Sequence, residues 1–387
     1  MVTGATAARQ RITSLDVVRG VVMVLMAIDH VRVYSGVPAG GPSPGIFFTR
    51  WVTHFCAPAF VFLAGTSAFL YGRTVANKGT LARYLASRGV LLILLELTII
   101  RFSWTFNVDY SSFLLAGVIW MLGWCMILLA ALVWLPLWAI GTLGLAIIAA
   151  QDLFGRIPGV LPASLQAVWG FIYIGGDDGP LTLGQGGPQV TILYTIVPWI
   201  GVMAAGYAFG SIMVREASAR TRLCLKIGVS ATVLFLVLAT ISTLMSSPQN
   251  GAPPFLLRML NQRKYPASQL FLLMTLGPTI LLLALVDAAR GPIARFFETF
   301  GRVPMFYYLL HIPVIHTLAL LVWRLRDGSV NTSWFHTAPY VSIPPQARWG
   351  LPLLYVVFVI AVAILYVPCR WFAGVKRRRQ DAWLRFL

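Results

Sequence analysis

The sequence predicts an all-α membrane protein that crosses the bilayer about ten times, with both termini in the cytosol. Of its 387 residues, 58% are hydrophobic and only 11% are charged, and the mean hydropathy is +0.79. A soluble domain would carry charge on about a quarter of its residues. Apolar runs long enough to cross about 30 Å of hydrocarbon recur along the whole chain. No separate soluble domain is apparent, so we expect one domain over 1–387.

Ten segments have the length and apolarity that a membrane-spanning helix requires. The N-terminal stretch MVTGATAARQR lacks a small-residue cleavage site after an apolar core, so we expect the first span to be retained rather than removed as a signal peptide. The expected spans are residues 15–35, 54–72, 89–107, 113–133, 136–153, 190–213, 227–246, 268–288, 303–323 and 350–369.

The net charge of +18 is distributed by side of the membrane. With a cytosolic N-terminus, the main basic clusters fall on the cytosolic side, which is the positive-inside pattern and predicts a multi-pass cell (inner) membrane protein. Attraction to anionic lipid explains most of this charge, so we expect the bilayer, and not nucleic acid, as a partner. One segment, 258–266, places basic residues on the outer side. The cytosolic clusters are 9–11, 73–88, 215–226, 290–302 and the basic tail 370–387.

The first expected span carries ionisable residues, which are costly in hydrocarbon. Asp16, Arg19, Met23, Met26 and His30 recur every three or four residues, so they form one stripe on a helix. Arg19 and His30 would lie about 16 Å apart along the helix and within about 20° of the same direction. A helix with one polar stripe turns it toward the bundle interior or a wet cavity. We expect Arg19 near the cytosolic boundary and His30 in the outer half of the membrane.

Two interpretations of this stripe are open from the residues alone. Asp16 and Arg19 are spaced as an interfacial ion pair, and His30 can be a packed, hydrogen-bonded histidine. The interpretation that we favour makes His30 functional, because histidine titrates near neutral pH and suits proton transfer. Asp29 either orients His30 or pairs with Arg32 at i,i+3.

Other polar residues within or beside the spans are candidates for a substrate site. Glu96 lies about 10 Å into the third span and needs a partner, for which Arg19 is available. A structural ion pair and a catalytic carboxylate are both open for Glu96. His54 begins the second span near the depth of His30, and Lys264 lies in the basic outer segment.

Two histidines share the ninth expected span. His311 is expected in a cavity and His316 at an interface. They are about 140° apart on a regular helix, so one metal ion cannot readily bind both, and we expect no metal.

Five segments carry a resemblance to a known family. They are RITSLDVVRGVVMVLMAIDHVR, HFCAPAFVFLAG, YTIVPWIGVMAAGYAFG, KYPASQLFLLMTLGP and FGRVPMFYYLLHIPVIH. In this order they resemble the bacterial branch of the heparan-alpha-glucosaminide N-acetyltransferase catalytic-domain family, long catalogued as a domain of unknown function. The likeness is strongest over 11–316. The spacing of Arg19 and His30 also resembles that of acyltransferase-3 membrane proteins.

The resemblance implies a transmembrane acyltransferase. Its donor would be cytosolic acyl-CoA, expected to be acetyl-CoA, and its acceptor a sugar hydroxyl or amine on the extracytoplasmic side. The lysosomal enzyme has Asn where His30 stands, and its proposed catalytic histidine lies in the following loop, where this chain has Gly40 and Gly41. Only the reaction class is therefore carried over, and the heparan substrate is not.

Acyl transfer from a thioester needs a base for the attacking group and a cation or donor for the developing oxyanion. We expect His30 as the base, Asp29 as a group that can orient it, and Arg19 as the ligand of a phosphate or of the pantetheine end of CoA. The basic stretches 73–88 and 290–302 could meet the four negative charges of CoA. The further candidates for binding substrate or acyl-CoA are His54, Glu96, Lys264 and His311.

Direct transfer and a transient acyl-histidine are both open. The competing hypothesis is a proton-coupled small-molecule transporter, in which the same buried groups would relay protons. Transporters often contain internal repeats, and the two halves of this sequence show no convincing duplication. This favours the enzyme.

Overall fold

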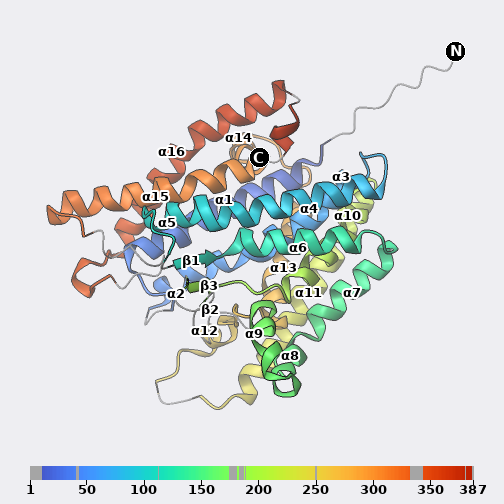
Figure 1. Cartoon of the computed structure of the whole chain (residues 1–387), viewed down its shortest axis with the longest axis horizontal. Coiled ribbons are helices and arrows are strands. Elements are labelled where there is room, and N and C mark those ends of the chain that lie inside the picture. Colours follow the sequence, from blue (N-terminus) through green and yellow to red (C-terminus); the bar gives the residue numbers. More distant parts are fainter. Residues whose placement is uncertain are drawn as a thin grey trace.

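The computed structural model describes residues 11–40, 43–111, 113–173, 181–182, 187, 189–248, 251–331, 343–379 and 381–385. Helices dominate these residues, which confirms the mainly helical class (Figure 1). The α-helices are α1 (Thr13–Ser35), α2 (Pro44–Trp51), α3 (Cys56–Gly72), α4 (Lys78–Leu95), α5 (Arg101–Thr105), α6 (Val118–Leu132), α7 (Leu137–Ala149), α8 (Gln151–Phe154), α9 (Ala163–Ile172), α10 (Trp199–Met213), α11 (Ala217–Met245), α12 (Phe255–Leu260), α13 (Gln269–Leu285), α14 (Pro292–Arg302), α15 (Pro304–Asp327) and α16 (Leu351–Arg378). The short helical turns are η1 (Val52–Phe55), the π-helical η2 (Glu96–Ile100), η3 (Ile157–Val160), η5 (Pro345–Ala347) and η6 (Ala382–Arg385).

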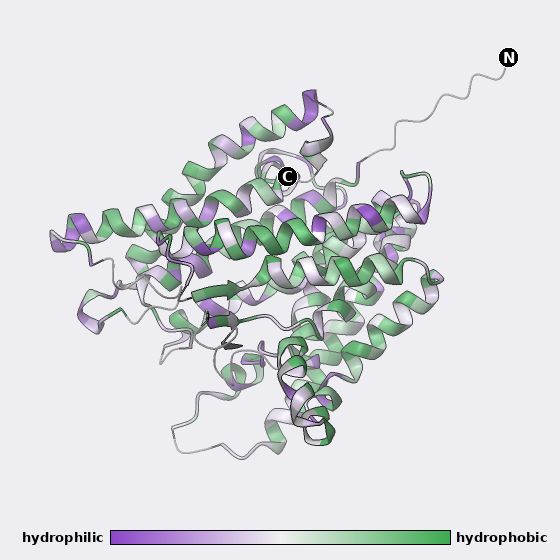
Figure 2. Cartoon of the chain, viewed as in Figure 1, coloured by the Kyte–Doolittle hydropathy of each residue, from purple (hydrophilic) through white to green (hydrophobic). Residues whose placement is uncertain are grey.

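Four helices in the described part of the chain are long and apolar enough to cross a membrane: the continuous run Pro44–Gly72, and α11, α15 and α16. Helices α6, α7, α10 and α13 are apolar but shorter. Each predicted span overlaps at least one of the helices, although the number of crossings stays a prediction. Figure 2 shows hydrophobic residues along the helices and hydrophilic residues mostly at helix ends and in connections. These features support a membrane protein.

The all-α prediction is wrong for two short regions, because a small three-stranded sheet is present in the order β1-β3-β2. Strand β1 (Phe113–Ala116) pairs in parallel with β3 (Gln189–Ile192), and β2 (Leu181–Thr182) pairs antiparallel with β3. The spans predicted over 113–133 and 190–213 therefore begin as strands, and their helices start at Val118 and Trp199. Hydropathy does not distinguish a short buried strand from the start of a buried helix, which explains the error.

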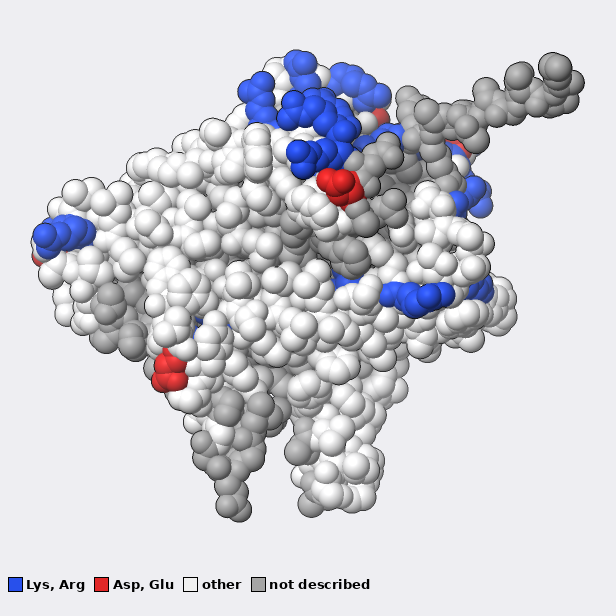
Figure 3. Space-filling model, turned by 45° about the horizontal axis from the view of Figure 1, so that its top comes forward, with Lys and Arg blue, Asp and Glu red and all other residues white. Residues whose placement is uncertain are grey.

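The basic segments gather at one end of the molecule. Ser14 donates a hydrogen bond to Asp287 at 2.9 Å, and Arg220 forms an ion pair with the same carboxylate at 2.6 Å. The starts of α1 and α11 and the end of α13 therefore meet, while Lys376 of α16 contacts the backbone oxygen of Arg302 at 3.5 Å. Figure 3 shows most of the visible Lys and Arg side chains on this part of the surface. The predicted clustering is confirmed, and its assignment to the cytosol stays a prediction.

Close backbone contact fixes α1 against α14 at this basic end. A Cβ atom on Gly20 would lie 1.8 Å from a backbone oxygen of α14, and a Cβ on Gly301 would lie 1.8 Å from one of α1. Only glycine allows such an approach. The neighbouring residues Arg19 and Arg302 are therefore held in a fixed relation to one another.

Candidate active site

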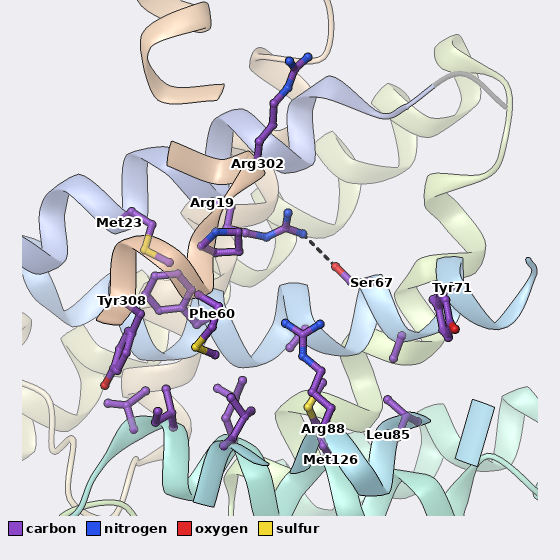
Figure 4. Close-up of a pocket in the computed structure, with 18 of the residues that line it drawn as sticks. Arg19, Met23, Phe60, Ser67, Tyr71, Leu85, Arg88, Met126, Arg302 and Tyr308 are labelled. Carbon is purple, nitrogen blue, oxygen red and sulfur yellow. Dashed lines mark hydrogen bonds between the residues drawn. The ribbon is translucent and has the colours of Figure 1, made fainter. Parts of the chain in front are cut away.

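A pocket with a volume of about 260 Å³ lies at the basic end, between α1, α3, α4 and α6 and the adjoining ends of α14, α15 and α16 (Figure 4). Its lining is largely apolar and aromatic apart from a set of cations, and it includes no carboxylate among the residues that the structure describes. The cations that define this basic pocket are Arg11, Arg19, Arg88, Arg302 and Lys376.

Arg19 is held in place by three groups on different elements. Its guanidinium donates to Ser67 Oγ at 2.9 Å, to Asp16 Oδ1 at 3.0 Å and to the backbone oxygen of Gly301 at 3.2 Å. The ion pair predicted between Asp16 and Arg19 is therefore confirmed. Figure 4 shows the guanidinium of Arg88 pointing from α4 toward that of Arg19. Two positive charges thus face the same part of the pocket.

Glu96 does not pair with Arg19, so that prediction is wrong. Its Oε2 accepts the backbone N–H groups of Ile119 at 2.9 Å and Trp120 at 3.2 Å, at the start of α6. The first N–H groups of a helix have no partner within the helix, and they bind a carboxylate well. A Cβ on Gly117 would lie 2.6 Å from Glu96 Oε1, so this glycine makes room for the cap. A role of Glu96 in binding acyl-CoA stays a prediction.

His30 and His311, which are far apart in the sequence, form a hydrogen-bonded pair. The distance from His30 Nδ1 to His311 Nε2 is 2.7 Å. The Nδ1 of His311 lies 2.6 Å from the backbone oxygen of Tyr308 and 3.2 Å from that of Tyr307. A carbonyl can only accept, so His311 carries its proton on Nδ1 and its Nε2 accepts from His30. This network assigns the His30 proton to Nδ1 and leaves a lone pair on Nε2.

The histidine pair is connected to the basic pocket through α1 and α15. Met23 of α1 and Tyr308 of α15 line the pocket, and the rings of Tyr308 and His311 are 5.1 Å apart. Met26, between Met23 and His30 on the predicted stripe, is buried. The stripe therefore faces the protein interior, as predicted. It runs along α1 from Arg19 at the pocket to His30.

Asp29 has two cationic partners. Its carboxylate pairs with Arg32 at 3.0 Å and with Arg50 at 2.8 Å, so the i,i+3 alternative is confirmed. His311, rather than this carboxylate, occupies the orienting position on His30 Nδ1. Arg50 was not predicted from the sequence, because α2 and α1 show no spacing pattern that relates them.

The remaining predicted residues lie outside the basic pocket. His54 is 7% exposed, and its buried Nδ1 has no hydrogen-bond partner among the residues that the structure describes. Lys264 is also 7% exposed, and its ammonium lies 5.5 and 5.2 Å from the ring centroids of Tyr194 and Tyr265. His316, expected at an interface, is buried inside the protein and bonds a backbone oxygen of α5 at 3.0 Å.

The sequence analysis did not predict that several of the pocket residues belong to one site. Arg88 and Arg302 belong to basic stretches that were expected to meet CoA, but their convergence with Arg11 and Lys376 depends on helix packing. Tyr308 gave no signal beyond its place in an apolar span. The predicted tail 370–387 is not a separate segment at its start, because α16 continues to Arg378.

These features define a helical membrane protein with a cation-lined pocket at one end and a histidine pair beyond it. The sequence model of the heparan-alpha-glucosaminide N-acetyltransferase catalytic-domain family matches residues 11–245, and the chain belongs to this family. Membership indicates a membrane acetyltransferase. The matched range includes Arg19 and His30, whereas His311 and Lys376 lie beyond it. A comparison with curated proteins finds no match.

Proposed function

We propose that the protein is a membrane-embedded acyltransferase that moves an acetyl group from acetyl-CoA to a sugar hydroxyl or amine. The observation that carries this proposal is a chain of side-chain contacts: Tyr308 lines the basic pocket and packs against His311, which is hydrogen-bonded to His30. Family membership supplies the reaction class. The donor binds at the basic end, and the acceptor approaches His30 from the opposite side.

The charges of the basic pocket suit the donor. CoA carries phosphate groups, and cationic side chains are the usual ligands of phosphate. Five cations define the pocket, and two of the neighbouring carboxylates, Asp16 and Glu298, offset part of their charge. Arg11, whose side chain is 58% exposed, is available to the nucleotide at the mouth. Apolar side chains such as Met23 and Phe60 suit the pantetheine arm.

The histidine pair supplies the base. The lone pair of the acceptor oxygen or nitrogen attacks the thioester carbonyl carbon, while His30 Nε2 takes the proton from the attacking atom. The C–S bond then breaks, and the leaving CoA sulfur takes that proton from the His30 imidazolium. His311 Nε2 accepts the Nδ1–H of His30 throughout, which orients the ring and stabilises its positive charge. In a route through an acetyl group on His30, Nε2 attacks the thioester carbon and the C–S bond breaks to release the CoA thiolate. The acceptor then attacks the acetyl carbon, the bond from that carbon to Nε2 breaks, and the acceptor proton passes to the thiolate.

The clustering of basic segments at one end supports the location that we propose. The basic end faces the cytosol, where CoA is made, and the chain lies in the cell (inner) membrane. Its partners are the bilayer and a sugar or glycan acceptor. The competing hypothesis, a proton-coupled transporter, would use the histidine pair as a proton relay and would release no CoA.

The proposal is tested with the purified full-length protein in detergent. Acetyl-CoA and CoA should raise the thermal unfolding midpoint, because a ligand at 100 times its Kd stabilises the folded state by about 2.7 kcal/mol. Acetyl-CoA with glucosamine should release free CoA, and His30→Ala should slow the release by about 100-fold or more while keeping the CoA-induced shift. An unmoved unfolding midpoint at millimolar CoA, together with no released thiol, would overturn the proposal.

A further inference from the structure

A second group of largely buried polar side chains lies beside His30 and outside the basic pocket. We call it the outer cluster and define it by Asp29, Arg32, Arg50, His54 and Lys264. Within this group, Lys264 is near enough to Asp29 to interact with it electrostatically, and His54 is near enough to Lys264, Arg50 and Asp29 to do the same. Arg50 joins α2 to α1 through Asp29, and it also donates to Thr53 at 3.1 Å. The cluster therefore adjoins His30, which is the next residue to Asp29 on α1.

The outer cluster contains more positive charge than its carboxylate can neutralise. Asp29 is already shared between Arg32 and Arg50. Among the residues that the structure describes, no carboxylate lies within ion-pair distance of Lys264. A buried ammonium without a counter-ion is costly, and the two aromatic rings near Lys264 offset only part of that cost.

Two further observations indicate a ligand at this cluster. Within the described part of the chain, the buried Nδ1 of His54 has no hydrogen-bond partner, although buried polar atoms are nearly always paired. The phenol of Tyr265 reports the local charge: burial by itself raises its pKa, but Lys264 and Arg50 outweigh the burial and lower the pKa to about 8. Solvent reaches the cluster, because the Asp29 side chain is 19% exposed.

We propose that the outer cluster binds a carboxylate or phosphate group of the acceptor, so that the protein acetylates an acidic sugar. Lys264 and Arg50 supply the positive charge, and His54 supplies a hydrogen bond. An anion held there lies next to the residue that precedes His30, so the acceptor amine or hydroxyl is directed toward the base. This inference rests on the proposed acyltransferase function and adds the class of its acceptor.

Three amino sugars with the same amine nucleophile test whether the outer cluster recognises a phosphate, a carboxylate or neither. They are glucosamine, which lacks an acidic group, glucosamine 6-phosphate and muramic acid, which carries a carboxylate. Binding is measured first as a shift in thermal unfolding of the full-length protein without donor, and then as kcat/KM for CoA release. We expect kcat/KM for at least one acidic sugar to exceed that for glucosamine by about tenfold or more, as one charge-assisted contact allows.

The variants test whether the outer cluster causes this preference. Lys264→Gln should remove the thermal shift by the acidic sugars and reduce their advantage to about twofold, and Lys264→Arg should keep most of it. Arg263→Gln is the matched control, because Arg263 is the neighbouring cation and its side chain is 56% exposed in a surface pair with Asp152. It should behave as the wild type.

The outcomes separate this inference from the proposed function. If CoA stabilises the protein but all three sugars bind and react equally, or if Lys264→Gln and Arg263→Gln have the same effect, the acidic-acceptor inference is wrong and the acyltransferase remains. If CoA neither stabilises the protein nor is released, the acyltransferase is wrong. An acidic sugar that still shifts the unfolding midpoint through Lys264 would then support the anion site alone.

Discussion

Replacing His311 with Asn should lower kcat for acetyl transfer by about 10- to 100-fold. In the wild type, His311 Nε2 accepts the Nδ1–H of His30 over 2.7 Å, and this bond sets which nitrogen of His30 is free to act as a base. The Asn amide reproduces the donor to the Tyr308 carbonyl but not the acceptor for His30. Loss of a group that orients a functional histidine typically costs 10- to 100-fold, which corresponds to about 1.4–2.8 kcal/mol in the barrier.

The effect should be confined to the chemical step. The KM for acetyl-CoA should stay within about twofold, because none of the five pocket cations contacts His311 through a hydrogen bond or ion pair in the described structure. His311→Gln should retain more activity than His311→Asn, since its longer amide can place an oxygen near the former Nε2. Thermal unfolding should show a loss of about 1–3 kcal/mol for the Asn variant, because the His30 Nδ1–H is left without its acceptor.

The assay is a double-mutant cycle on CoA release from acetyl-CoA. His30→Ala alone should lower kcat by about 10²- to 10⁴-fold, as the loss of a general base does. Adding His311→Asn to His30→Ala should cause little further loss, because His311 acts only through His30. Wild-type turnover by folded His311→Asn, or losses that multiply in the double mutant, would refute the reasoning.

Three other predictions test the donor pocket and the packing around it. Arg88→Gln should raise the Kd for CoA about tenfold, measured by thermal shift, because it removes a charge from the phosphate site. Arg83→Gln, on the exposed face of α4, should leave the Kd unchanged. Equal losses of CoA affinity in the two variants would contradict the pocket. Glu96→Ala should lower stability by about 1–3 kcal/mol, because it leaves two buried N–H groups without an acceptor; an unaltered unfolding midpoint would exclude the cap. Gly65→Ala should destabilise the α3–α10 contact by about 1–3 kcal/mol, because its Cβ would lie 2.1 Å from a backbone oxygen of α10. Gly170→Ala is the control, because among the described residues no atom outside its own stretch of helix backbone lies within 4 Å of the added Cβ. It should change the unfolding midpoint far less, and equal shifts would contradict the contact.

The features that the sequence predicted well depend on local periodicity. The bounds of α1, the inward-facing stripe from Arg19 to His30 and the segregation of basic clusters all follow from spacing along one helix or from the alternation of spans. Such patterns are written in neighbouring residues, so no knowledge of helix packing is needed to find them.

The features that it did not predict depend on contacts between distant segments. His30 and His311 are brought together by the packing of α1 against α15, and no spacing rule relates them. Glu96 was assigned an ionic partner because a buried carboxylate needs a donor, but the N–H groups at the start of a helix satisfy the same need. The strand at 113–116 escaped notice because its partner lies more than seventy residues further along the chain.

The most direct test of the central claim is transfer across a sealed membrane. The protein is reconstituted into proteoliposomes, and its orientation is determined by protease access to the basic segment 376–379. Acetyl-labelled CoA is supplied on the side of the basic end, and glucosamine or an acidic amino sugar is enclosed on the other side. We predict labelled N-acetyl sugar on the acceptor side, an equal amount of free CoA on the donor side, and neither product with His30→Ala. Passage of unmodified sugar without release of CoA, or labelled product only on the donor side, would contradict the claim.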